Sequence, residues 1–175
     1  ERNGTPLRMH LLDAPGYTDF LGHALPALDA VETAAIVINA QNGIELGATR
    51  MMQRAQKNGL CRIIIVTRID AENLDLPGLL EELQQAFGRE CLPLNLPAGR
   101  GTRVSDCFFA PAGESDFSSV AAVHSALIDQ VVEVDEKLME VYLEKGEIEP
   151  DQLHDPLERA LREGHLIPVV FTSAR

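Results

Sequence analysis

Four short apolar runs that alternate with helical patterns constrain the fold of this chain more than any other feature of its sequence. The runs cover residues 7–12, 34–39, 62–67 and 167–171, and each ends in polar or turn-forming residues. Short apolar runs of this length are typical of parallel strands whose two faces are both covered. The sequence therefore predicts four buried parallel strands.

Helical periodicity follows each of the first three runs. The patterns cover residues 19–31, 48–58 and 76–87, and Gly59 and Gly88 close the last two as left-handed caps. Such alternation predicts an α/β fold with a doubly wound, mostly parallel sheet and right-handed crossovers. Ligands of these sheets bind beyond the carboxyl ends of the strands, so the residues that follow the apolar runs are the candidates for a site.

The alternation stops near residue 97, where prolines and glycines interrupt it. A segment at 103–109 is the only strand-like piece that follows for some distance. Apolar residues then recur at helical spacing from about 117 to 145, which predicts one long helix, with a helix that is broken once as the alternative. A further helix is expected from Asp155, as its N-cap, to Gly164, before the chain returns to the last strand.

Composition excludes several classes of protein. The chain has 27 acidic against 15 basic residues, a net charge of -12, which opposes a broad nucleic-acid-binding face. Its apolar runs are far shorter than the roughly 18 to 20 residues of a membrane-spanning helix. The three cysteines lie far apart and form no metal-ligand or disulfide pattern, which favours a reducing, cytoplasmic setting.

The first candidate motif is Asp13-Ala14-Pro15-Gly16, at the end of the first apolar run. A D-x-x-G sequence in GTPases places a carboxylate near Mg²⁺ and a backbone N–H at the γ-phosphate. The same spacing recurs at Asp75 and Gly78, but Asp75 follows a polar stretch and is expected to cap the next helix. Asp13 and Gly16 are therefore the phosphate-side candidates, and an ordinary strand-end turn is the alternative.

The second candidate is Thr67-Arg68-Ile69-Asp70, directly after the third run and similar to the N-K-x-D element that reads guanine. An aspartate there can accept hydrogen bonds from the N1–H and N2–H₂ of guanine, which adenine cannot donate. Arg68 can lay its planar head along the base. Thr67 replaces the usual asparagine, and its shorter hydroxyl is expected to weaken contacts with the base and the phosphate loop. A strand end with a solvated Arg–Asp pair is the alternative.

The third candidate is the segment after the last run, where Ser173, Ala174 and Arg175 look like the S-A-K element of GTPases. A backbone N–H of that element meets the guanine O6. By itself this short motif is more often an ordinary exit from a strand. Three motifs in the GTPase order, each at the end of a predicted strand, together favour a guanine-nucleotide site.

Longer segments make the resemblance specific. Residues 11–20 (LLDAPGYTDF) resemble the D-T-P-G-H-x-D-F segment of elongation factor G and its relatives, and residues 37–45 resemble the strand and loop that follow it. Residues 133–143 resemble the E-x-D-E-x-L-x-E-x-Y-L of the family's helical insert, called G′. The resemblance spans nearly the whole chain; the exception is residues 102–118, which are short for that insert.

The resemblance implies a translational GTPase that binds GTP or GDP with Mg²⁺, the ion near Asp13, and couples hydrolysis to a ribosomal step such as translocation. It divides the chain into a GTPase core at 1–100, an inserted, mainly helical G′-like subdomain at 101–165, and the last core strand with its S-A-R element at 166–175. The ribosome, including its stalk proteins through the insert, is the implied partner.

Two departures from the family's pattern affect the expected activity. The chain has no Gly-Lys dipeptide, so the G-x-x-x-x-G-K-[ST] loop that cradles phosphates is missing, as is the switch I threonine. We therefore expect weak or absent GTP binding, and no hydrolysis, by this chain alone.

Tyr17 is the second departure, because these GTPases usually carry at this place the histidine that orients the attacking water. A phenol can hold a water but does not titrate near neutral pH as imidazole does, so slower or altered hydrolysis is expected. The alternatives are a degenerate GTPase domain that binds the ribosome without turnover, a ribosomal protection or release factor, and an unrelated α/β domain.

Overall fold

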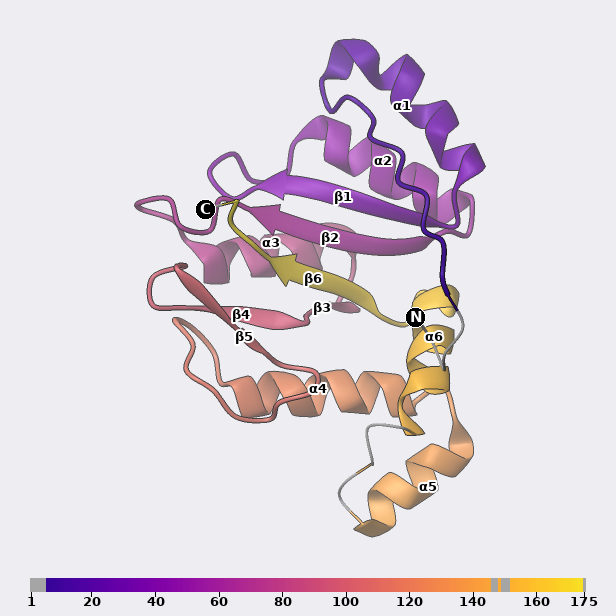
Figure 1. The fold of residues 1–175 in the computed structure, drawn as a ribbon, viewed down its shortest axis with the longest axis vertical. Helices are drawn as coiled ribbons and strands as arrows, with labels where there is room; N and C mark the ends of the chain where they lie inside the picture. The colour runs from indigo at the N-terminus through magenta and orange to yellow at the C-terminus, as the bar shows by residue number, and fades with distance from the viewer. Residues whose placement is uncertain (1–5, 146–147, 149–151, 175) are drawn as a thin grey trace.

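The centre of the molecule is a four-stranded parallel sheet in the order β1-β2-β6-β3 (Figure 1). It is seen in a computed structural model that describes residues 6–145, 148 and 152–174. The strands are β1 (Thr33–Asn39), β2 (Cys61–Thr67), β3 (Cys91–Pro93) and β6 (Ile167–Phe171). Parallel neighbours require crossover connections, and helices supply them. The predicted α/β fold is therefore confirmed, as are the strands expected at 34–39, 62–67 and 167–171.

Helices precede and separate the strands of the first half. They are η1 (Thr18–Phe20), α1 (Leu21–Ala27), η2 (Leu28–Ala30), α2 (Leu46–Lys57) and α3 (Leu76–Phe87). Pro26 lies near the end of α1 and lacks the N–H that would continue an α-helical ladder, so the helix expected at 19–31 is a short one between two 3₁₀ turns. Asp75 caps α3 by accepting a hydrogen bond from Gly78 N at 3.0 Å, as predicted.

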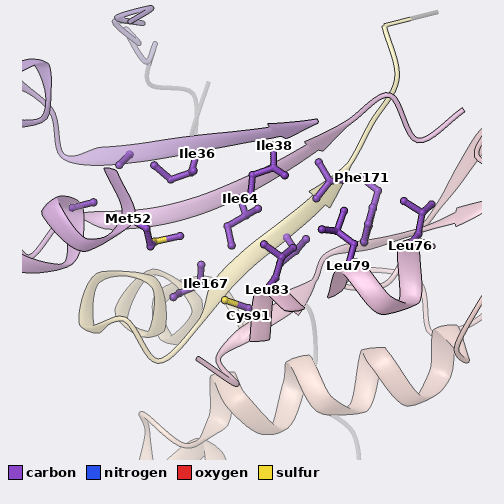
Figure 2. Packing of buried hydrophobic residues seen from close by; sticks show 14 of the residues in the cluster. Ile36, Ile38, Met52, Ile64, Leu76, Leu79, Leu83, Cys91, Ile167 and Phe171 are labelled. Atoms are coloured by element: carbon purple, nitrogen blue, oxygen red, sulfur yellow. The ribbon is translucent and has the colours of Figure 1, made fainter. Parts of the chain in front are cut away.

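A hydrophobic core fills the space between the sheet and helices α2 and α3 (Figure 2). Ile36 and Ile38 of β1 point to the same side of the sheet as Ile64 of β2, and Met52 of α2 and Leu83 of α3 pack against them. Successive side chains of a strand point to opposite faces, so this core uses every second residue of β1 and β2.

The other face of β1 is exposed. Thr33, Ala35 and Val37 point away from the core, and 61% of Val37 is accessible to solvent. The prediction of strands buried on both faces is therefore wrong for β1, because α2 packs against only one of its faces. The prediction failed because Val37 is apolar although its side chain is exposed.

The first predicted strand, at residues 7–12, does not exist. Residues 6–16 lie in an extended coil that pairs with no other part of the described chain (Figure 1). Leu7, Met9, Leu11 and Leu12 are between 58% and 85% exposed. A strand is stable only when its backbone N–H and C=O groups find a ladder partner, and apolar residues alone do not provide one. This expectation was wrong.

Among its described residues, the second half of the chain adds a small antiparallel hairpin and the α-helices α4, α5 and α6. The hairpin pairs β4 (Asn95–Ala98) with β5 (Arg103–Asp106), and α4 (Val120–Val132), α5 (Glu136–Lys145) and α6 (His154–Glu163) follow. Neither β3 nor β4 was predicted, and β5 is shorter than the segment expected at 103–109. A second hydrophobic cluster joins these elements and runs from Leu96 to Leu166.

The long helix predicted at 117–145 is broken, as its alternative allowed. Asp135 lies between α4 and α5, and its side chain accepts hydrogen bonds from the N–H groups of Lys137 and Leu138 at 3.1 and 3.2 Å. An aspartate in this role begins a new helix rather than continuing the old one. The start of α6 also differs from the prediction, because Leu153 and not Asp155 precedes the helix, while Gly164 ends it with a φ of 77°. Among the described residues, no helix combines the length and apolar character needed to cross a membrane.

Candidate functional site

Two loops meet where β2 and β6 end, and we call residues 67–70 and 172–174 the strand-end loops. Parallel strands bring their carboxyl ends to one edge of the sheet. The pairing of β2 with β6 continues past the strands, since Thr172 N donates to Val66 O at 2.8 Å and Ile69 N donates to Thr172 O at 3.4 Å. Two motifs that lie about a hundred residues apart in the sequence therefore become neighbours.

A side-chain hydrogen bond joins the two loops. Ser173 Oγ donates to Asp70 Oδ1 at 2.7 Å, and both side chains are partly buried. A hydroxyl that donates to one carboxylate oxygen fixes the orientation of the carboxylate. The structure thus brings together Asp70 and Ser173, which belong to two separate candidate motifs of the sequence.

Thr67 and Arg68 have different roles within the same loop. Thr67 Oγ1 donates to Ile38 O at 3.3 Å, and Ala40 N donates to Thr67 O at 3.0 Å, so Thr67 ties the loop to the end of β1. Arg68 has a φ of 59°, in the left-handed region, and its side chain is exposed. Ala174 is exposed, whereas the expected Arg175 lies outside the described residues.

The phosphate-side candidates lie in a different part of the chain, which we call the leading segment (residues 6–17). Asp13, Gly16 and Tyr17 lie at the surface, and 79% of Tyr17 is accessible to solvent. The carbonyl oxygen of Gly16 lies 3.2 Å from the position that a Cβ atom would take at Gly47, in the first turn of α2. Tyr17 O accepts a hydrogen bond from Phe20 N at 2.9 Å. In the described chain, no hydrogen bond joins these three residues to the strand-end loops.

Asn95 was not predicted to have a role, but its side chain holds the end of β6, directly before residues 172–174. Asn95 Nδ2 donates to Phe171 O at 3.1 Å, and Phe171 N donates to Asn95 Oδ1 at 2.8 Å. The amide side chain thus copies the pairing of a neighbouring strand and holds the last residue of β6. Its partner is 76 residues away, so no local pattern could have revealed it.

The sequence also missed the turn between β4 and β5. Gly99, Arg100 and Gly101 all have positive φ, and the carboxylate of Asp116 accepts hydrogen bonds from Arg100 N and Gly101 N at 3.0 and 2.9 Å. Gly101 is buried against the backbone of Ile69, which belongs to a strand-end loop. The glycines near residue 100 were visible in the sequence, but only as a break in the alternation.

Comparison with known proteins decides the family of this chain. The family model of the elongation factor Tu GTP binding domain matches residues 2–175. The chain belongs to this family. Its similarity to elongation factor G-like proteins, set out below, makes it an elongation factor G-like member of these translational GTPases.

Several relatives of this GTP-binding domain are similar over most of the chain. An elongation factor G-like protein of Mycobacterium tuberculosis is 32% identical over 94% of the chain, which is 25% of that protein. An elongation factor G-like protein of Thermotoga maritima is 27% identical over 95% of the chain and 26% of its own length. A mitochondrial ribosome-releasing factor 2 of Culex quinquefasciatus is 30% identical over 77% of the chain and 19% of its own length.

A solved structure agrees with the fold of the GTP-binding domain. A crystal structure of a protein from Thermus thermophilus superimposes with a TM-score of 0.77 at 32% identity, and the match covers 92% of this chain and 26% of that one. These matches cover nearly all of this chain but only about a quarter of the length of each relative.

The residues present fit a guanine base better than a magnesium ion. Asp70 has an oriented carboxylate at the edge of the sheet where β2 and β6 end, which is the kind of group that a base with adjacent N–H donors requires. For Mg²⁺, the described residues contain no group of three or more His, Cys, Asp or Glu side chains that could hold a metal ion. Asp13 is a single carboxylate, and Mg²⁺ requires octahedral coordination by several oxygen ligands.

Two cysteines of this domain, Cys91 and Cys107, are buried, and burial disfavours their thiolate forms. Burial raises the pKa of the Cys91 thiol to about 12, with a further rise from Glu90 and an opposing effect of Arg62. Burial likewise raises the pKa of Cys107 to about 11, and Asp106 adds to the rise. Since the thiolate is the reactive form, both side chains serve as small apolar groups in their cores.

Proposed function

We propose that this chain is the guanine-recognising part of a longer translational GTPase, which binds GTP and couples its hydrolysis to a ribosomal step such as translocation. The observation that carries the proposal is the Asp70–Ser173 pair at the adjoining ends of β2 and β6. The family match over residues 2–175 supports it, as does the order of the three motifs along the chain.

In this proposal the strand-end loops read the base. Asp70 accepts from guanine N1–H and N2–H₂, and Ser173 keeps the carboxylate turned toward these donors. Arg68 is exposed and lies along the face of the base, while the N–H of Ala174 donates to O6. Thr67, whose hydroxyl already donates to Ile38 O, contributes to the loop rather than to the ligand.

The leading segment provides the phosphate-side groups of the proposed enzyme. Gly16 offers a backbone N–H to the γ-phosphate and Asp13 offers one carboxylate near the magnesium ion that accompanies GTP. If bound beside Asp13, Mg²⁺ would neutralise charge on the phosphates. Tyr17 holds the attacking water through its hydroxyl. Their position at the surface of this chain supports the expectation that it alone binds GTP weakly or not at all.

An Asp70→Asn substitution tests the base-reading role. Asparagine has an NH₂ donor in place of one carboxylate oxygen. This donor would face the N2–H₂ donor of guanine unfavourably, but it can donate to the C2 carbonyl of xanthine. In the full-length protein we expect GDP affinity to fall about 100-fold and XDP affinity to rise, measured by titration with fluorescent nucleotides. Unchanged GDP affinity with a normal thermal midpoint would refute the proposal.

A second candidate is a degenerate domain of this family that binds the ribosome without turnover, and the exposed Tyr17 favours it. GTP hydrolysis by the full-length protein, with and without ribosomes, separates the two. The enzyme hypothesis predicts ribosome-stimulated turnover that a Tyr17→His variant increases; no turnover in either protein favours the degenerate domain. A role in ribosome release or protection is the finer alternative, since one relative is named a ribosome-releasing factor.

The partners of the proposed GTPase follow from its class. The ribosome is the main partner, with stalk proteins bound through the helices of residues 101–165, in the cytoplasm. The net charge of -12 supports contact with proteins or with a local stretch of RNA rather than a broad nucleic-acid face.

A further inference from the structure

We propose that the turn between β4 and β5 positions the base-reading loop, so that guanine discrimination depends on Gly101 and Asp116. This inference rests on the proposed function, because it assigns two further residues to the same site. Both act through Asp70 and are positioning residues rather than ligands of the base.

The first observation is the contact between Gly101 and the base-reading loop. A Cβ atom at Gly101 would overlap the carbonyl oxygen of Ile69, and it would lie 2.6 Å from the carbonyl carbon and 3.1 Å from Asp70 N. These three atoms belong to the peptide that joins Ile69 to Asp70. Only a residue without a side chain can support that peptide so closely, and Gly101 also has a φ of 73°, which favours glycine.

The second observation is the way in which the turn itself is held. The two oxygens of Asp116 accept from the successive N–H groups of Arg100 and Gly101, at 3.0 and 2.9 Å. Asp116 N donates to Pro97 O at 2.7 Å, which fixes the carboxylate beside the hairpin. Successive N–H groups in such a turn form a concavity that suits an anionic group. Asp116 therefore stabilises a turn in which three consecutive residues have positive φ. This conformation is unfavourable for a residue with a side chain, so the support matters most at Arg100.

The third observation is that the segment that follows β6 also contacts the base-reading loop. Ile69 N donates to Thr172 O and Ser173 Oγ donates to Asp70 Oδ1. The peptide between Ile69 and Asp70 is thus contacted both by this segment and by the turn between β4 and β5. A shift of this peptide moves the Asp70 carboxylate away from the base, and displacements of about 1 Å in such sites have large effects.

The test compares Gly101→Ala with Gly59→Ala in the full-length protein. Gly59 has a φ of 66° and nothing within 4 Å of an added Cβ, so its alanine variant carries the same backbone strain without the contact to Ile69. The readout is the ratio of the dissociation constants for IDP and GDP, because inosine lacks the 2-amino group from which Asp70 accepts. We expect Gly101→Ala to lower this ratio about tenfold and Gly59→Ala to leave it unchanged.

Two further variants separate positioning from general destabilisation. Asp116→Asn removes one acceptor of the turn without adding bulk, so it should lower the ratio in the same direction if Gly101→Ala does not fold. In an Asp70→Asn background, Gly101→Ala should cause no further fall, because its effect passes through Asp70. An unchanged ratio in folded Gly101→Ala and Asp116→Asn proteins would overturn the inference, as would a further fall in the double variant. A wild-type protein with no preference for GDP would instead refute the proposed function, and the inference with it.

Discussion

The strand-end loops are tied to the sheet and to each other by hydrogen bonds, whereas the leading segment lies exposed and pairs with no described strand. Both regions carry motifs that the sequence placed at strand ends. The first region is held by contacts from β1, from the residues after β6 and from the β4–β5 turn. Contacts within this chain therefore fix its geometry. Among the described residues, the backbone hydrogen bond of the second region joins Tyr17 to Phe20, and the carbonyl oxygen of Gly16 approaches α2 at Gly47.

This difference shows that a motif is positioned by its tertiary neighbours rather than by the apolar run that precedes it. Thr67–Asp70 follows a strand that pairs on both sides, and its peptides are fixed at several points. Asp13 also follows an apolar run, but that run has no partner strand within the described chain.

The largest expected effect comes from the core beneath the strand-end loops. Phe171 is 1% exposed and packs edge-to-face on Phe117, with ring centroids 5.9 Å apart. Phe171→Ala should lower the free energy of unfolding by about 3–5 kcal/mol, whereas Leu11→Ala, at an 85% exposed position, should change it by less than about 0.5 kcal/mol. Urea unfolding measures both. A comparable loss in Leu11→Ala would show that the leading segment is packed after all.

A smaller effect is expected from Asn95, which holds the end of β6. Asn95→Ala leaves the N–H and C=O of Phe171 without their partners, which should cost about 1–3 kcal/mol. Amide exchange at Phe171 and Thr172 should accelerate in the variant, while exchange in residues 7–12 should stay as fast as before. Asn42→Ala is a suitable control, because Asn42 makes its side-chain hydrogen bond to Glu45 on an exposed loop. Unaltered exchange at Phe171 would mean that β6 does not depend on this amide.

A third effect is confined to alkaline pH, where it concerns Cys91 in the sheet. The pKa of Cys91 is raised from 9.0 to about 12 by burial, so the unfolded chain loses this proton at a lower pH than the folded one. Its contribution to stability is therefore complete below pH 9 and is lost as the pH rises from 9 to about 12. The free energy of unfolding should fall less steeply across this range in Cys91→Ala than in the wild type. Equal slopes would indicate that water reaches Cys91 in the folded protein.

Local sequence patterns determined much of the fold, as particular elements show. Apolar runs, helical periodicity and glycine caps predicted β1, β2, β6, α2 and α3, and Asp75 was recognised as a cap. These features depend on side chains a few residues apart, and their physical causes are local. The short strands β3 and β4 escaped prediction because they are only three and four residues long and contain prolines.

The family and the three motifs could be read from the sequence by itself, because each motif is a short, ordered set of residue types. Only the tertiary structure decided which motifs are joined: it placed Ser173 on Asp70, Asn95 on Phe171 and Gly101 on Ile69, and left residues 7–12 unpaired. Each of these outcomes depends on contacts between residues far apart in the chain, or on a partner strand for a run that has none among the described residues. Local composition does not encode such partners, so the contacts between the strand-end loops form only when the sheet is assembled.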